Sequence, residues 1–487
     1  MKRYLFLLLL AAQAVHAQRK PNVIYIYADD MGVGELGSYG QQKIRTPWLD
    51  QLAKEGMRFT RHYSSFPVCA PSRCALMTGR HAGHSFIRGN YEMGGFEDDK
   101  EGGQMPLPEG TFTIAQLMKR AGYVTGAIGK WGLGMNNTTG DPNRQGFDYF
   151  YGYLDQKQAH NFYPTHLWEN GKWDTLRNPY IKVHQPIPAG SPDAAFELYK
   201  GKDYSIDKMA EKTVAFIREN RNKPFFLYLP YTGPHVSLQA PDEAVKEYIG
   251  QFDEKPYYGQ KGYAPAKYPL STYAAMITYF DKQIGKVIQL LKDLHLDENT
   301  IVMFSSDNGP TFNVGGTDTD YFNSAMGLRG RKQDLYEGGI RAPFLVRWPG
   351  KVAKGVVSDH LSVQFDLMAT LSELTGVSAG ATDGISFLPT LLGQSGKQKQ
   401  HPYLYFEFPE KSGQVAIIRG HLKAIKTNMK EKGVWEVYDL RKDEKETSDL
   451  STSHTADIAA FEAILKKDHY QATVQDWEFV DPKFKKK

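Results

Sequence analysis

Only two cysteines occur in the 487 residues, Cys69 and Cys74, and they stand five residues apart. Two thiols are too few for a structural zinc site. A disulfide between them would close a tight loop and constrain a chain of this size very little, although exported proteins often use disulfides. By themselves the two residues are compatible with a small disulfide loop, with inert thiols or with chemistry at one sulfur.

Polar or charged side chains follow four short apolar runs, and these are further candidates for chemistry. The runs occupy residues 22–28, 122–128, 224–229 and 300–305, and the residues that follow them are Asp29-Asp30, Gly129-Lys130, the loop that holds His235, and Asp307-Asn308. Runs that are apolar almost throughout are typical of strands buried on both faces in a parallel sheet. Because ligands bind beyond the carboxyl ends of such strands, we expect these side chains to gather at one edge of the sheet.

Helical patterns lie between the apolar runs, at residues 46–55, 113–121, 207–220 and 273–294. Alternation of strands and helices predicts an α/β sandwich. From about His401 the pattern changes to short alternating strands followed by a helix at residues 455–467, which indicates a smaller antiparallel subdomain. We therefore expect a catalytic domain at residues 18–385 and a C-terminal subdomain at residues 386–487.

The N-terminus has the features of an export signal. Lys2 and Arg3 precede an apolar run at residues 4–12 that is too short to span a bilayer, and Val15-His16-Ala17 offers a cleavage site. An N-terminal membrane anchor is the alternative. No later segment is apolar enough to cross a membrane, so we expect an exported protein, periplasmic or secreted, without membrane insertion.

The composition is that of a globular protein, with 41% hydrophobic and 23% charged residues. The formal net charge of +4 falls to +2 without Lys2 and Arg3. So small a balance argues against nucleic acid or an anionic membrane as the main partner. Any attraction for an anion must therefore be local, at a site.

The string C-x-P-S-R at residues 69–73, followed by Thr78-Gly79-Arg80, resembles the motif of type I sulfatases of the alkaline-phosphatase superfamily. The resemblance extends over residues 21–450. It implies an alkaline-phosphatase-like sandwich, in which helices flank a large and mostly parallel central sheet. It also implies that a formylglycine-generating or sulfatase-maturating enzyme oxidises Cys69 to formylglycine. A buried thiol in a turn is the alternative.

The resemblance further implies one calcium ion. Its ligands would be Asp29, Asp30, Asp307, Asn308 and the side chain made from Cys69. Three carboxylates and an amide carbonyl are hard oxygen donors, and Ca²⁺ takes six to eight of these. Adjacent aspartates at strand ends also commonly cap helices, which is the alternative for each pair.

Three other segments match the family's sulfate-binding motifs. Gly129–Leu133 with Gly134 resembles G-K-W-H-L-G and makes Lys130 a ligand of the sulfate, with Arg73 beside the nucleophile. The family's histidine is replaced here by Gly132, so we consider His160 as a substitute. The segment at residues 230–235 resembles T-P-H and makes His235 a sulfate ligand and leaving-group acid. The segment at residues 331–339 resembles G-K-x-x-x-Y-E-G-G and makes Lys332 the companion of His235 at the sulfate.

Residues downstream of Cys69 are candidates for contact with a sugar. Arg88 and Asn90 are expected there together with His160, and weaker candidates are His81, His84, Tyr163 and Trp168. An aromatic side chain is more often part of a core than a platform for a sugar ring.

The resemblance is greatest to bacterial carbohydrate sulfatases and predicts hydrolysis of a sulfated glycan, with a galactose or N-acetylgalactosamine sulfate as first candidate. A phosphatase, phosphodiesterase or phosphonate hydrolase of the same superfamily is one alternative, although family phosphatases generally need a second metal site. A glycan-binding protein without catalysis is another, because of Gly132.

Overall fold

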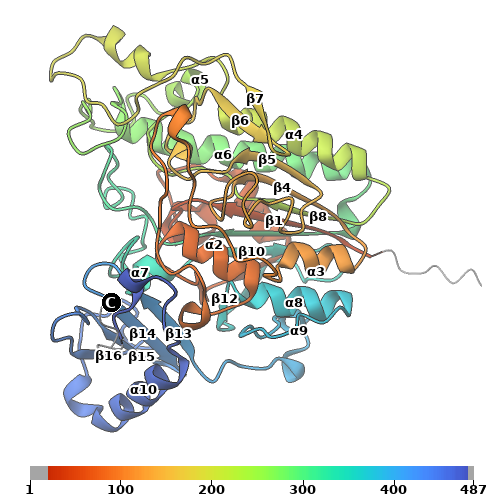
Figure 1. The fold of residues 1–487 in the computed structure, drawn as a ribbon, viewed down its shortest axis with the longest axis vertical. Helices are drawn as coiled ribbons and strands as arrows, with labels where there is room; N and C mark the ends of the chain where they lie inside the picture. The colour runs from red at the N-terminus through yellow and green to blue at the C-terminus, as the bar shows by residue number, and fades with distance from the viewer. Residues whose placement is uncertain (1–19, 481–487) are drawn as a thin grey trace, which may run out of the picture.

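The computed structural model describes residues 20–480, which form a large body and a smaller lobe built by the C-terminal part of the chain (Figure 1). The expected export signal at residues 1–17 and the lysine-rich end at residues 483–487 lie outside the described residues. Within residues 20–480, no helix is both long enough and apolar enough to cross a membrane.

A ten-stranded sheet forms the centre of the large body. Its strands are β1 Asn22–Ala28, β2 Met57–Phe59, β4 Val124–Lys130, β5 Tyr149–Tyr153, β6 His166–Glu169, β7 Lys172–Thr175, β8 Phe225–Leu229, β9 Thr300–Ser306, β10 Phe344–Arg347 and β11 Val356–Ser358. They lie in the order β11-β2-β10-β9-β1-β8-β4-β5-β6-β7. The five central strands β9, β1, β8, β4 and β5 pair in parallel, whereas β10 runs antiparallel to both of its neighbours and β6 and β7 form an antiparallel edge.

Both faces of the sheet are buried, as the unbroken apolar runs require. Along β1, Ile24 and Ile26 contribute to one core cluster, and Tyr25 and Tyr27 contribute to the other. Successive side chains of a strand point to opposite faces, so a strand between two layers must be apolar at every position.

Helices cover the two faces in separate groups (Figure 1). The first group packs with Ile24 and Ile26 and consists of α1 Pro47–Glu55, α4 Ser205–Asn220 and α6 Pro269–Asp293. The second group packs on the opposite face and consists of α2 Cys69–Thr78, α3 Ile114–Arg120, α8 Asp366–Thr375 and the short α9 Leu388–Leu391. Two further short helices are α5 Asp242–Lys246 and α7 Glu337–Ile340, and a two-stranded sheet joins β3 His62–Tyr63 to β12 Ser362–Val363.

The smaller lobe is an antiparallel sheet with one long helix. Its strands are β13 Leu404–Phe408, β14 Gln414–Arg419, β15 Leu422–Lys426 and β16 Trp435–Asp439, and its helix is α10 Thr455–Asp468. Phe461 and Leu465 of α10 pack on one face of this sheet. The other face packs against Val68 and Leu335 of the large body, so the lobe is docked through an apolar surface.

The fold class predicted from the sequence is confirmed, both for the mostly parallel sheet with helices on two faces and for the antiparallel C-terminal sheet. The sequence did not predict the helix that begins at Cys69. The domain boundary after residue 385 stays a prediction. Leu388 and Leu391 pack in the core of the large body, and Trp477 near the end of the described chain returns to that core.

A buried histidine of the C-terminal lobe should make its stability depend on pH. His469 contacts Glu407 and Glu478, each at 2.9 Å. Burial alone would lower the pKa of His469, but the hydrogen bonds to the two carboxylates raise it to about 9. The unfolded value is about 6.5, so this stabilisation is complete below pH ~6.5 and disappears as the pH rises towards 9.

We expect the melting temperature of the wild type to fall between pH ~6.5 and 9, and His469→Gln to flatten that slope. Thermal unfolding across this pH range tests the prediction, with His421→Gln, whose side chain is 41% exposed, as the control. An unchanged slope in His469→Gln would contradict it.

Candidate active site

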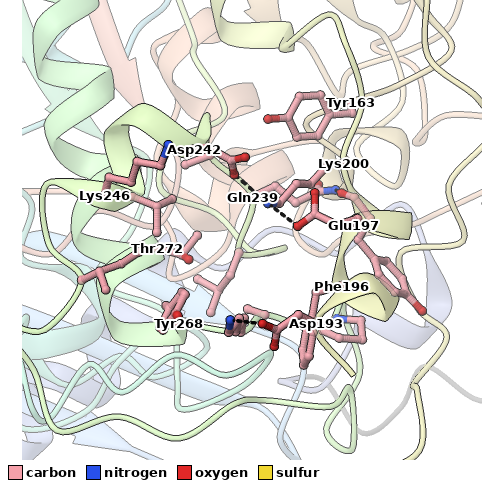
Figure 2. A pocket seen from close by; sticks show the side chains of 18 residues that line it. Tyr163, Asp193, Phe196, Glu197, Lys200, Gln239, Asp242, Lys246, Tyr268 and Thr272 are labelled. Carbon is pink, nitrogen blue, oxygen red and sulfur yellow. Dashed lines mark hydrogen bonds and ion pairs between the residues drawn. The ribbon is translucent and has the colours of Figure 1, made fainter. Parts of the chain in front are cut away.

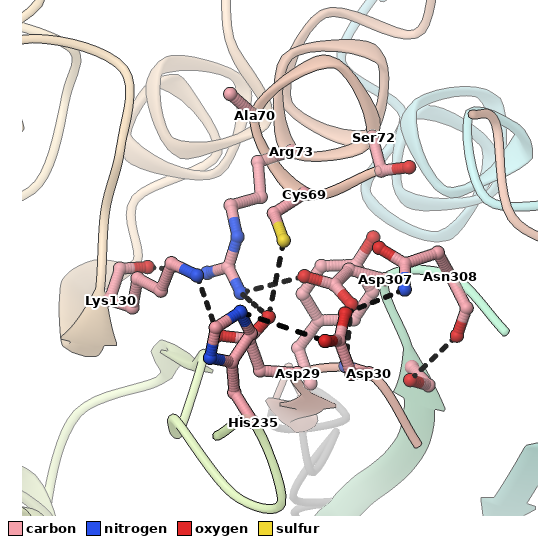
Figure 3. Close-up of polar contacts among 12 residues, drawn as sticks. Asp29, Asp30, Cys69, Ala70, Ser72, Arg73, Lys130, His235, Asp307 and Asn308 are labelled. Carbon is pink, nitrogen blue, oxygen red and sulfur yellow. Dashed lines mark hydrogen bonds and ion pairs between the residues drawn. The ribbon is translucent and has the colours of Figure 1, made fainter. Parts of the chain in front are cut away.

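Cys69 is the first residue of α2, and Arg73 lies one turn further on the same face of that helix. Both side chains are buried. Cys69 and Cys74 are both free thiols, so the disulfide alternative does not apply to this structure. Figure 3 shows the Cys69 sulfur pointing towards Asp29, and the Sγ–Oδ1 distance is 3.3 Å.

The expected metal ligands meet where β1 and β9 end side by side. The backbone N–H of Asp30 donates to Asp307 Oδ1 at 3.0 Å, and Asn308 Nδ2 donates to Asp30 Oδ1 at 2.8 Å. Asp30 has a φ of +65°, a left-handed conformation that aspartate tolerates better than most residues. This turn brings both carboxylates at the end of β1 into the same buried space.

Three cations pair with these carboxylates. Lys130 at the end of β4 donates to Asp29 Oδ2 at 2.7 Å, and Lys332 donates to Asp30 Oδ2 at 2.8 Å. Arg73 donates to Asp307 Oδ2 at 3.0 Å. Each of the three carboxylates near Cys69 therefore has a cationic partner.

His235 joins this cluster from the loop after β8. Its Nε2 lies 3.2 Å from Lys332 Nζ and 3.6 Å from Asp30 Oδ2. Its Nδ1 lies 2.5 Å from the carbonyl oxygen of Val236, which only accepts, so Nδ1 carries a proton and Nε2 faces the site. Asp29, Asp30, Cys69 and His235 offer ligand atoms close enough together to hold one metal ion.

The pKa values of the cluster reflect burial and mutual pairing. Burial alone would raise the pKa of Asp29, but Lys130 and its neighbouring cations hold it well below the usual range. Burial together with the charge of Asp29 raises the pKa of Asp307 to about 7 and that of the Cys69 thiol well above its usual value. Burial and the nearby Lys332 lower the pKa of His235 to about 4. Such opposed shifts in one buried cluster are typical of a functional site.

The donor set fits a hard divalent cation. Asn308 Oδ1 is buried and has no hydrogen-bond partner in the structure, although a buried amide oxygen normally has one. It lies among three carboxylates at a single edge of the sheet, where a cation would give it a partner. The residues present therefore fit the calcium site that the resemblance implies.

The residues expected to contact a sugar lie in different environments. His160 is close to the cluster, because its ring stacks on that of His235 with centroids 5.0 Å apart. Asn90 accepts the Ala70 N–H at 3.1 Å, next to Cys69. Arg88 is 2% exposed and donates to Glu407 and to the carbonyl oxygens of Ser85 and Gly83. We therefore leave Arg88 out of the proposed substrate contacts.

The weaker candidates lie further away. His81 and His84 stack on each other beyond the C-terminal end of α2, beside Asp383. Trp168, in β6 at the edge of the sheet, donates to Glu101. These contacts give each of them a partner within the protein.

Several residues near the site were not predicted from the sequence. His184 Nε2 lies 3.2 Å from His160 Nδ1, and Tyr263 packs against the rings of both His160 and His235. Glu410, in the turn between β13 and β14, accepts the backbone N–H of Asn90. Burial raises the pKa of Glu410, whereas this hydrogen bond and the charge of Lys332 act to lower it. These residues come from three separate loops with no shared motif, so only the folded chain brings them together.

Tyr163 lines a separate cavity of about 270 Å³ (Figure 2). Two of its three lining lysines pair with carboxylates of the same cavity, Lys200 with Glu197 and Asp242 and Lys267 with Asp193. Residues of the Cys69 cluster do not line it. We therefore place the candidate active site at the cluster in Figure 3 and not in this cavity.

Comparison with known families identifies the chain. The model of a family described as Sulfatase matches residues 21–377, and a second, described as N-sulphoglucosamine sulphohydrolase, C-terminal, matches residues 331–481. Human N-acetylgalactosamine-6-sulfatase is 33% identical over 404 residues, which cover 80% of this chain and 69% of that protein. The N-acetylgalactosamine-6-O-sulfatase of Bacteroides thetaiotaomicron is 29% identical over 512 residues, which cover 92% of this chain and 93% of that protein.

Solved structures agree with these relatives. The crystal structure of Ps i-CgsB in complex with k-i-k-neocarrahexaose has a TM-score of 0.75 and 27% sequence identity, and the match covers 96% of each chain. A second structure comes from work on the metabolism of multiple glycosaminoglycans by Bacteroides thetaiotaomicron. It has a TM-score of 0.71 and 26% sequence identity, and the match covers 92% of this chain and 99% of that one. The alkaline-phosphatase-like fold expected from the sequence is confirmed.

The cluster predicts that Asp307→Asn loses metal. The substitution keeps the size of the side chain but removes one of three negative charges, and calcium affinity depends strongly on the charge of its ligands. We expect bound calcium to fall from about one per chain to near zero, measured by elemental analysis after dialysis in calcium-containing buffer.

Asp281→Asn is the matched control, because Asp281 is equally buried but accepts the N–H groups of Trp48 and Leu49 at the start of α1. Full calcium content in Asp307→Asn would contradict the assignment. A loss shared by both variants would point to general unfolding instead of a lost ligand.

Proposed function

The chain belongs to the sulfatase family, and from this premise we propose that it hydrolyses sulfate esters of carbohydrates at the Cys69 cluster. One observation supports this most strongly. Lys130, Lys332 and His235 converge on the same buried space as Cys69 and three carboxylates. That arrangement offers positive charge and a proton donor to a tetrahedral anion, with a nucleophile position at the start of a helix.

We propose that Asp29, Asp30, Asp307 and Asn308 hold one calcium ion, and that Cys69 is oxidised to formylglycine by a maturation enzyme. In this family the hydrated aldehyde supplies the nucleophile, and calcium supplies positive charge that polarises the sulfate group. The buried carboxylates of this chain and the unpartnered Asn308 Oδ1 support the assignment.

Lys130 and Lys332 would bind the sulfate oxygens. Both ammonium groups are already desolvated and held by carboxylates, at 2.7 and 2.8 Å, so little reorganisation is needed when substrate enters. Coulomb attraction is stronger in such a water-poor site than at a surface. Arg73 of α2 would hold Asp307 and the end of β4 in place, since it donates to Asp307 Oδ2 and to the carbonyl oxygen of Lys130.

His235 would donate a proton to the departing sugar oxygen. Its Nε2 faces the site, because Nδ1–H is bound to the Val236 carbonyl. With no anion present, burial and Lys332 keep its pKa at about 4, so the ring is neutral at pH 7. The negative charge of a bound sulfate ester opposes the effect of Lys332 and favours the protonated ring, which is the form that a general acid needs.

For the substrate, we propose a galactose or N-acetylgalactosamine sulfate. The human and Bacteroides relatives named above act on N-acetylgalactosamine 6-sulfate by their names, and they match most of this chain. Asn90 and His160 are the proposed sugar contacts, since they lie beside Cys69 and His235 respectively. We further propose that the protein is exported, periplasmic or secreted, through the signal at residues 1–17.

Release of inorganic sulfate and phosphate from a panel of sulfated and phosphorylated sugars tests the function. The protein is made in a host that installs formylglycine, and wild type and Cys69→Ser are assayed with Ca²⁺. We expect the wild type to release sulfate, and Cys69→Ser to lose turnover and to accumulate a sulfate ester visible by intact mass. Release of phosphate instead would replace the proposal with a phosphatase, and normal turnover by Cys69→Ser would remove Cys69 as the source of the nucleophile.

The acid role of His235 predicts a leaving-group effect. Substitution by Gln should reduce kcat for a sugar sulfate by roughly 100-fold, because an alkoxide leaves poorly without a proton. For an aryl sulfate, whose phenolate leaves readily, the loss should be less than about 10-fold. Steady-state kinetics on both substrates measures the difference. His184→Gln is the control, because His184 contacts His160, which in turn stacks on His235. Equal losses on the two substrates would exclude His235 as the acid.

A further inference from the structure

We propose that Gln156 is a positioning residue of the active site, whose side-chain amide donates a hydrogen bond to an oxygen carried by residue 69 after maturation. The proposal rests on the proposed function. It assigns a role to a residue that lies outside every motif discussed above.

Gln156 fills the space in which residue 132 would carry a side chain. Gly132 has a φ of +73°, and a Cβ added there would lie 2.5 Å from Gln156 Nε2 and 2.7 Å from its Cγ. A side chain at residue 132 and the present position of Gln156 therefore exclude each other. The glycine that departs from the family pattern is thus accompanied by an amide in the same place.

The amide of Gln156 has a donor without a partner. The residue is 3% exposed, and its Nε2 is buried with no hydrogen-bond acceptor among residues 20–480. A buried N–H group without an acceptor costs free energy, and a catalytic role or a bound group is one explanation for such a donor in a native protein. The backbone N–H of Gln156 donates to Gln104 Oε1 at 3.0 Å, which fixes the start of the side chain.

Gln156 lies next to Gly132 in space and precedes His160 in the chain. On one side is Gly132, two residues beyond Lys130, whose ammonium contacts Asp29 beside Cys69. On the other side the same loop continues to His160, whose ring stacks on His235. An oxygen bound at the active site would give this free amide an acceptor.

An amide can orient such an oxygen but cannot exchange a proton with it near neutral pH. Gln156 would therefore hold the group on residue 69 in one orientation and contribute no ionisation to the pH profile. Its effect should appear in kcat and not in KM, and equally for sugar and aryl sulfates, because it does not touch the leaving group.

The first test is Gln156→Met, which keeps the length of the side chain and removes the donor. We expect kcat to fall by roughly 100-fold with KM unchanged. We expect the melting temperature of the same variant to be equal or higher, because an unsatisfied buried donor has been removed. Gln158→Met is the control, since that amide donates to the Phe96 carbonyl, and it should retain activity.

The second test is Gln156→His, which restores a donor that titrates. We expect partial recovery of kcat relative to Gln156→Met, and a new ionisation between pH ~5 and 8 in its kcat profile. A kcat of Gln156→Met within two-fold of wild type would overturn the proposal, as would a lower melting temperature with a matching loss of folded protein. Sulfate release by the wild type is the reference: its absence would refute the proposed function, while the melting temperatures would still report on the free donor.

Discussion

The burial of charge is the constraint on which the rest of the structure depends. An isolated buried ion costs several kcal/mol, and that cost is offset only by close partners of opposite sign. Asp29, Asp30 and Asp307 meet this requirement with Lys130, Lys332 and Arg73, and all six side chains are buried. Lys130, Arg73 and Lys332 come from three different elements. The cluster therefore forms only when the strand ends, α2 and the loop at residue 332 are in place.

The C-terminal lobe takes part in this arrangement. The two residues after Lys332 contact the smaller lobe: Gln414 Nε2 at the start of β14 donates to the Gln333 carbonyl at 2.9 Å, and Lys411 in the turn before β14 pairs with Asp334 at 2.7 Å. The same turn carries Glu410 towards Asn90. Contacts with the lobe therefore help to position the segment that carries one of the three cations.

Much of this site could be predicted because its residues lie directly after buried strands or within a compact motif. The apolar runs before Asp29 and Asp307 predict neighbouring parallel strands, and parallel strands bring their carboxyl ends together. The helix at Cys69 was missed because its hydrophobic pattern is weak, with all of residues 69–77 buried and no polar face. His184, Gln156 and Glu410 were missed for a different reason, since their contacts join segments that lie apart in the sequence. For Gln156 a signal existed in Gly132, but a missing side chain does not indicate which residue fills its place.

We propose that the charge cluster holds one cation and a sulfate group together. Anomalous X-ray diffraction from crystals of the matured protein, grown with calcium and a sulfated sugar, would locate both. We expect a single calcium peak bonded to oxygens of Asp29, Asp30, Asp307 and Asn308, with Asn308 Oδ1 as a ligand and the sulfate between Lys130 and Lys332. A peak elsewhere, or a sulfate bound away from residue 69 with Lys130 still paired only to Asp29, would contradict it.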